Sequence, residues 1–129
     1  MTEPTHYLNV DLDLWARFDL QPLVDALARD TTVMNVGPRP GGQHFASLEV
    51  ARRTTTADAT IRAFAKLIAK LPRRARFDWN RARLRSFNIG IQAGSEPYAF
   101  ELHLAPETIT TAAALDARIT ITVYRPHTG

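Results

Sequence analysis

The sequence predicts an α+β fold of two layers, in which a five- or six-stranded, mainly antiparallel sheet carries three helices on one face. Two patterns lead to this prediction. Apolar and polar residues alternate with a period of two in several separate stretches, as in strands with one buried and one exposed face. Between these stretches, apolar residues recur three and four positions apart, which is typical of amphipathic helices. The predicted order is β-α-β-β-α-β-β-α-β, in a single domain over residues 1–129.

The amino-terminal part begins with a strand and a helix. In Tyr7–Trp15, apolar residues at the even positions alternate with polar or aromatic ones, which predicts a strand. Asp19 stands where an N-cap acceptor is expected, and Pro22 fits the first turn of a helix over Leu20–Arg29. Thr31–Val36 is a short strand candidate.

A loop, a strand and a second helix follow. Gly37–Gly42 contains three glycines and two prolines, which predicts a loop. Alternation resumes in Phe45–Arg52. An apolar stripe over residues 57–71 predicts a helix, with an N-cap in Thr54–Thr56 and Pro72 at its end.

The carboxy-terminal part is predicted to complete the sheet. Arg73–Arg85 has no regular period, so an irregular or one-turn element is expected there. Ser86–Gln92 and Tyr98–Leu104 alternate and are predicted as two strands joined by a turn. Pro106 opens a third helix, and Ala117–Tyr124 is the last strand.

The composition excludes several classes of protein. The 129 residues include no cysteine, which excludes disulfide scaffolds, thiol redox chemistry and thiolate metal sites. The longest apolar run is far short of the ~20 residues that span a bilayer. The first residues form neither a cationic nor an apolar leader segment. We therefore expect a cytoplasmic protein that does not bind membranes.

Positive charge is concentrated in one part of the chain. The net charge is +3, but residues 62–85 alone carry nine Lys or Arg side chains and one aspartate. A basic block on an otherwise acidic protein attracts polyanions such as nucleic acids. The candidate nucleic-acid contacts are Arg73, Arg74, Arg76, Arg81, Arg83 and Arg85. Because arginine outnumbers lysine fourteen to two, the alternative is a compositional bias toward arginine on a solvated face.

The polar residues of the strands are expected to form an open face of the sheet. Carboxylates on this face would suit a basic protein partner. The candidate partner-binding residues are Asp11, Asp13, Glu49, Glu101 and His103. If their strands were neighbours, Asp11, Asp13, Glu101 and His103 would converge on a divalent cation, which leaves a metal-assisted enzyme as an alternative. No metal or cofactor is predicted, since no ligand spacing specific to one accompanies these residues.

Three aromatic residues are predicted on the same face, and they favour a homodimer. They are Tyr7, Trp15 and Tyr124. Aromatic residues are enriched at interfaces, and one self-complementary patch suffices for a two-fold dimer. The alternative is a monomer in which Trp15 folds over a helix edge and Arg73–Arg85 covers Tyr124.

Three stretches of the sequence resemble a small family of bacterial α+β domains of unknown function, which are discussed beside the immunity proteins of polymorphic toxin systems. Tyr7–Val10 followed by Phe18–Val24 resembles the family's first strand and acidic helix start. Phe100–Glu107 resembles its strand followed by a Pro-Glu helix opening, and Leu115–Tyr124 its last strand. The resemblance implies an α+β fold and brings no catalytic residues.

These observations favour a non-catalytic module that binds a protein partner through the polar sheet face. Nucleic-acid binding through Arg73–Arg85 is the alternative, and a metal-assisted enzyme is less favoured. His44, beside the glycine-rich loop, is a candidate general base, but no carboxylate that would orient it is evident, so an exposed loop histidine is the simpler interpretation. Neither a Gly-x-Ser-x-Gly motif nor a phosphate-binding loop occurs.

Overall fold

The computed structural model describes residues 3–52 and 54–127 and confirms the α+β fold class. The described residues form five strands, four α-helices and one short 3₁₀ helix. In chain order these are β1 (His6–Ala16), α1 (Gln21–Leu27), η1 (Ala28–Asp30), β2 (Thr31–Arg39), β3 (Gln43–Val50), α2 (Ala57–Ala69), α3 (Arg73–Arg81), β4 (Leu84–Gln92), α4 (Pro106–Ala114) and β5 (Arg118–Tyr124).

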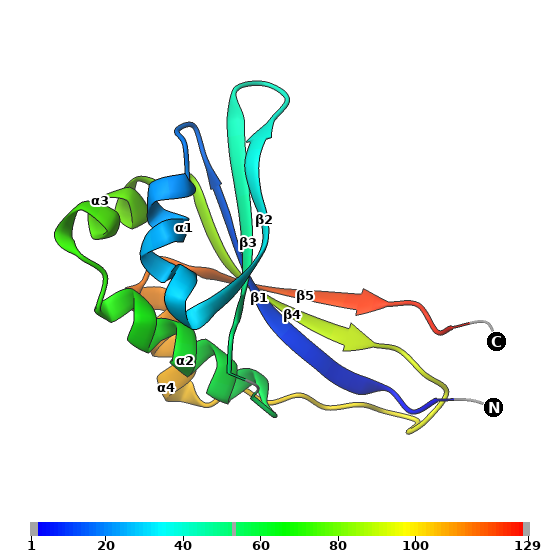
Figure 1. Cartoon of the computed structure of the whole chain (residues 1–129). Helices are drawn as coiled ribbons and strands as arrows, with labels where there is room; N and C mark the ends of the chain where they lie inside the picture. Colours follow the sequence, from blue (N-terminus) through cyan, green and yellow to red (C-terminus); the bar gives the residue numbers. More distant parts are fainter. Residues whose placement is uncertain (1–2, 53, 128–129) are drawn as a thin grey trace.

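The five strands form one mixed sheet in the order β2-β3-β1-β4-β5, with β1 at its centre. The β2–β3, β3–β1 and β1–β4 pairs are antiparallel, whereas β4 and β5 are parallel. The parallel pair requires a crossover, which α4 and the segment before it provide. The helices lie together on one side of the sheet (Figure 1).

The core lies between the sheet and the helices. The even-numbered residues of β1 from Val10 to Ala16 point into it, as the alternation predicts. Phe87 and Ile89 of β4 extend this apolar face, and Phe64 of α2 packs on it with its ring centre 5.9 Å from that of Phe87. Trp79 of α3 is fully buried, and its indole N–H donates a hydrogen bond to the carbonyl oxygen of Leu115.

The predicted strand at Tyr98–Leu104 is wrong, because this segment is irregular. Its even-numbered residues do alternate with polar ones, and Leu102 and Leu104 contact the core. However, β1 and β5 occupy the two edges of β4, so the segment has no edge of that strand to join. Asp58 in the first turn of α2 instead anchors the chain just after this segment. The Asp58 carboxylate accepts a hydrogen bond from the backbone N–H of Ala105.

Two other elements also differ from the prediction. Arg73–Arg81 is a nine-residue helix, so there are four α-helices where three were predicted. Its buried residues are Ala75, Asp78 and Trp79, and the single carboxylate among them obscures the apolar period. The loop predicted at Gly37–Gly42 is shorter in the structure, because β2 continues to Arg39 and β3 begins at Gln43.

A bulge in β1 alters which face Tyr7 occupies. Tyr7 pairs with Ile91 and Asn9 pairs with Gly90, so Leu8 is an extra residue without a partner in this register. Because side chains alternate along a strand, one extra residue moves all those before it to the other face. Tyr7 therefore points to the helix side, contrary to the prediction. No helix among the described residues is long and apolar enough to cross a membrane.

Candidate binding site on the open face of the sheet

The side of the sheet opposite the helices is polar in its centre, and we refer to it as the open face. The cross-strand pairs place Asn9, Asp11, Asp13 and Trp15 of β1 on it, beside Phe45 and Ser47 of β3 and Ser86 and Asn88 of β4. Glu49 of β3 joins them through its hydrogen bond with Asn9. Of the five partner-binding residues that the sequence predicts, Asp11, Asp13 and Glu49 thus meet on adjacent strands.

Asp11 and Glu49 form a pair of carboxyl groups, which we call the acid pair. Asn9 connects them, because its side-chain amide donates to Glu49 Oε1 at 2.7 Å and to Asp11 Oδ1 at 3.2 Å. No Lys, Arg or His side chain of the described residues lies within salt-bridge distance of either carboxyl group. The pair therefore has no cationic partner within residues 3–52 and 54–127.

The environment of Asp11 favours its protonated form. Burial, the hydrogen bond to Glu49 and the negative charges of Glu49 and Asp13 raise the pKa of Asp11 from 3.8 to about 7. At lower pH, the protonated carboxyl group donates a hydrogen bond to the Glu49 carboxylate. At higher pH, the two negative charges lie side by side.

Asp13 has a different role, because neighbouring side chains donate hydrogen bonds to both of its carboxylate oxygens. Ser47 donates a hydrogen bond to its Oδ1 at 2.9 Å, and the Asn88 amide donates to its Oδ2 at 3.3 Å. Thr122 of β5 donates in turn to Asn88 at 2.7 Å. This chain of hydrogen bonds connects four strands and fixes the side chains of the open face before any partner arrives.

A glycine makes room for Asn9. A Cβ atom added to Gly90 would lie 2.7 Å from Asn9 Oδ1 and 3.6 Å from the ring of Tyr124. A larger residue at position 90 would therefore force the Asn9 side chain to shift away from the position in which it reaches both carboxyl groups. Asn9 is not among the site residues predicted from the sequence, although its position two residues before Asp11 places it on the same face.

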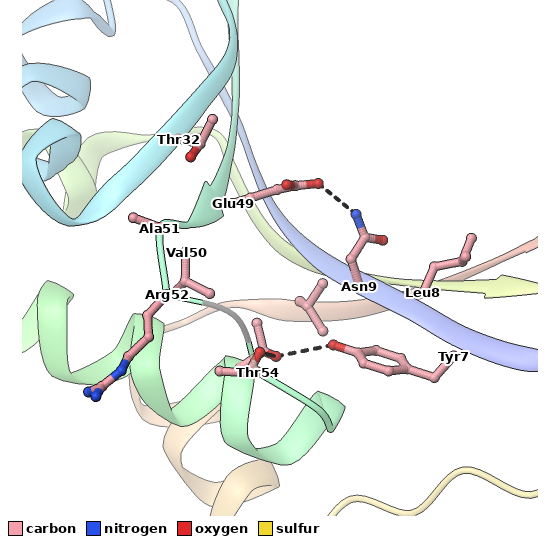
Figure 2. Close-up of a pocket in the computed structure, with 11 residues that line it drawn as sticks. Tyr7, Leu8, Asn9, Thr32, Glu49, Val50, Ala51, Arg52 and Thr54 are labelled. Atoms are coloured by element: carbon pink, nitrogen blue, oxygen red, sulfur yellow. Dashed lines mark hydrogen bonds between the residues drawn. The ribbon is translucent and has the colours of Figure 1, made fainter.

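A cleft of about 300 Å³ adjoins the acid pair, at the point where β1 and β3 separate (Figure 2). Glu49 and Asn9 line its polar wall, and Leu8, Val10 and Val50 line other parts. Arg52 also lines the cleft, but its side chain points away from Glu49 and Asn9 (Figure 2).

Hydroxyl groups line the opposite end of the cleft. Tyr7 Oη lies 3.1 Å from Thr60 Oγ1 of α2, and Thr60 also contacts the hydroxyl of Thr54. Burial raises the pKa of the Tyr7 phenol above its usual 10.0, so the phenol is neutral at physiological pH. The cleft thus has the Glu49 carboxyl group at one end, with Asp11 beside Glu49 but outside the lining, and uncharged hydroxyls at the other end.

Aromatic residues lie at both ends of the open face. Trp15 packs against Phe45 with 4.7 Å between ring centres, and the Arg39 guanidinium lies 5.2 Å from the centre of the Phe45 ring. Tyr124 is half exposed beside Gly90. Trp15 and Tyr124 are therefore placed as the dimer prediction requires, while Tyr7 is not. The dimer itself stays a prediction.

Glu101 and His103 do not join the acidic residues of the open face. Both lie in the irregular segment before α4, largely exposed, with 3.3 Å between His103 Nε2 and Glu101 Oε2. Within the described part of the chain, no three His, Cys, Asp or Glu residues are arranged to hold a metal ion. The predicted convergence of Asp11, Asp13, Glu101 and His103 is therefore not formed.

Half of the arginines predicted to contact nucleic acid make internal contacts instead. Arg85 is buried and donates hydrogen bonds to the backbone carbonyls of Trp79, Ala82 and Asp116. Arg81 pairs with Asp78, and Arg76 donates to the carbonyl of Ile68. The other three are exposed, namely Arg73, Arg74 and Arg83.

His44 is part of β3, where it pairs with Ala16 of β1 and Pro38 of β2, and not part of a loop. Its Nδ1 is buried without a hydrogen-bond partner among the described residues.

Comparison with protein-family models, with curated proteins and with solved structures finds no significant match. The resemblance to immunity-like domains therefore stays a prediction.

Proposed function

We propose that the protein is a non-catalytic binding module whose open face receives a basic partner protein. One cationic side chain of the partner enters the cleft and lies against the acid pair. The observation that carries this proposal is the position of Asp11 and Glu49, two half-buried carboxyl groups beside a cavity, with no cation of the described residues within salt-bridge distance of either one.

A cation is the ligand that this arrangement favours most. Two carboxylates in contact repel each other when both are ionised, and a positive charge between them removes that repulsion. Partly buried ion pairs are also screened less by salt than exposed ones. The volume of about 300 Å³ lies at the lower limit of small-molecule pockets, which suits a single side chain.

The rest of the open face supports a protein partner. Aromatic residues and arginine are enriched among the interface residues that contribute most of the binding energy. Trp15, Phe45 and Arg39 form a group of this kind on the open face. The hydrogen-bonded side chains around Asp13 are already ordered, which reduces the entropy lost on binding. The resemblance to immunity-like domains favours the same class of function, a module that acts by binding.

The raised pKa of Asp11 gives the proposed binding a pH dependence. A cation in the cleft favours the ionised form of Asp11, so binding releases the proton that Asp11 holds below about pH 7. The affinity for the basic partner should therefore increase as the pH rises through 7.

Calorimetric titration with a hexa-arginine peptide tests the proposal. We expect binding that is several-fold tighter at pH 8 than at pH 6, and at least tenfold weaker in the double variant Asp11→Asn/Glu49→Gln. The control Glu101→Gln/Glu107→Gln removes the same charge elsewhere and should change the affinity less than twofold. Equal weakening in both variants would show a general electrostatic effect and contradict a specific site.

A further inference from the structure

A second cavity, of about 650 Å³, lies on the helix side and is strongly basic; we call it the basic groove. One wall is α2 with its C-cap residue Lys70, and Arg62, Lys66 and Lys70 line the cavity at four-residue intervals. The other wall is formed by η1 and the residues after β3, which contribute Arg29 and Arg52. The helix α2 crosses the lower left of the molecule in Figure 1.

The positive charge of the basic groove is not neutralised locally. Five cationic side chains line it, against one carboxylate, that of Asp30. All five are exposed, and none forms an ion pair within residues 3–52 and 54–127. Arg81 of α3 and Arg85 of β4 differ, because each is paired with an aspartate.

Hydrogen bonds at the end of β3 and at the start of α2 hold the walls of the basic groove. Ala59 and Ala63 face it from α2, and their small side chains leave the space between the two walls unfilled. The backbone N–H of Ala51 donates to the Asp30 carbonyl at 3.0 Å, which ties the end of β3 to η1. Thr56 caps α2 through a hydrogen bond from the N–H of Ala59. The cations are thus presented on a preformed surface.

We propose that the basic groove binds the phosphodiester backbone of a single-stranded nucleic acid. Cations at four-residue intervals on a helix lie about 6 Å apart along its axis, a row that matches successive phosphates better than one compact anion. Arg73 and Arg74 follow Lys70 closely in the chain and are exposed, which lengthens the basic track. No aromatic side chain of the described residues lines the groove, so base stacking contributes little and binding does not depend on sequence. This proposal is independent of the one for the open face.

The test is fluorescence anisotropy with labelled oligothymidine and oligoadenosine, each twelve nucleotides long, at several salt concentrations. Both should bind with similar affinity at low salt. In Arg62→Gln/Lys66→Gln, the affinity should fall at least fivefold, and the slope of log affinity against log salt should decrease by about 1.4, since each phosphate contact on a single strand contributes about 0.7.

A matched control removes two exposed cations outside the groove, Arg17→Gln/Arg125→Gln, and should change the affinity less than twofold. Equal losses in both variants, or no binding by the wild type at low salt, would overturn the proposal. Inorganic tripolyphosphate and a duplex of the same length are the competing probes. Tighter binding of either one than of the single strand would also overturn it. Unchanged circular dichroism of both variants would show that the losses do not come from unfolding.

Discussion

Asp11 keeps its proton in the folded protein at pH values where an ordinary aspartate has lost it, because it is half buried and faces Glu49 and Asp13. Its pKa is raised from 3.8 to about 7, so between these values the folded state binds more protons than the unfolded state. The stability that this proton confers is complete below pH 3.8 and is lost as the pH rises through about 7.

The variant Asp11→Asn should remove this pH dependence. A pKa difference of one unit corresponds to about 1.4 kcal/mol in the free energy of unfolding. Solvent screening at this half-exposed site reduces the expected change in that free energy between pH 5 and pH 8 to about 1 kcal/mol. Urea unfolding should therefore show that the free energy of unfolding of the variant, relative to that of the wild type, is about 1 kcal/mol higher at pH 8 than at pH 5. A difference between the two proteins that does not change with pH would contradict this assignment.

Gly90 is the second residue whose replacement should affect the open face. In Gly90→Ala, the new methyl group would meet Asn9 Oδ1, and the amide would lose its hydrogen bonds to the acid pair. We expect a loss of about 1–2 kcal/mol in the free energy of unfolding. The side-chain amide signal of Asn9 should also shift in the NMR spectrum. An unchanged signal would show that Asn9 does not need the space.

The helix α3 shows how an element depends on one buried charge. The guanidinium of Arg85 donates to the carbonyl oxygens of Trp79 and Ala82 at the end of this helix and to the carboxylate of Asp116, with donor–acceptor distances of 2.7–3.0 Å. The variant Arg85→Gln leaves these buried carbonyls without their donor and should cost about 2–4 kcal/mol in thermal or urea unfolding.

Arg83→Gln is the control for Arg85, because Arg83 is exposed and only two residues away. Its effect should stay within about 0.5 kcal/mol, as for most surface substitutions. If both variants were equally stable, the hydrogen bonds of Arg85 would not support α3.

The sequence patterns correctly predict those elements that have both a regular local period and a partner to pair or pack with in the folded protein. The alternation in β1, β3, β4 and β5 identifies strands correctly because each of these has a neighbouring strand with which its backbone pairs. The same alternation in Tyr98–Leu104 fails, since the pattern reports which side chains contact the core and not whether the backbone has a free edge to join. Which strands pair is a long-range property that one sequence does not contain.

The site could be predicted in part for the same reason. Asp11 and Asp13 share a face by simple alternation, and Glu49 joins them because β3 lies beside β1. The bulge at Leu8 could not be foreseen, and it moves Tyr7 from the open face into the cleft. The cleft itself forms where β1 and β3 separate, which depends on the end of β3 at Val50.

The whole molecule separates its charges between its two layers. The open face has carboxyl groups at its centre, and the basic groove lies among the helices. A homodimer through the open face, as predicted from Trp15 and Tyr124, would bring two acid pairs into one interface. Self-association should therefore be stronger at pH 6, where Asp11 is protonated, than at pH 8.

Sedimentation equilibrium at tens of micromolar protein measures this association. We expect a mass above the 14.4 kDa of one chain at pH 6 and a return toward it at pH 8. Trp15→Ala should abolish the dimer at both pH values. A mass of 14.4 kDa under all conditions would contradict the dimer.

The most direct test of the binding function follows the open face during titration. In ¹⁵N-labelled protein at pH 8, hexa-arginine peptide should shift the amide signals of residues 9–11 and 49–52 around the cleft. Signals of the exposed acidic residues Glu101 and Glu107 should not move. Saturable shifts confined to the cleft, and lost in Asp11→Asn/Glu49→Gln, are the result we predict. Shifts spread over all exposed carboxylates, or unchanged in that variant, would contradict a cation site at the acid pair.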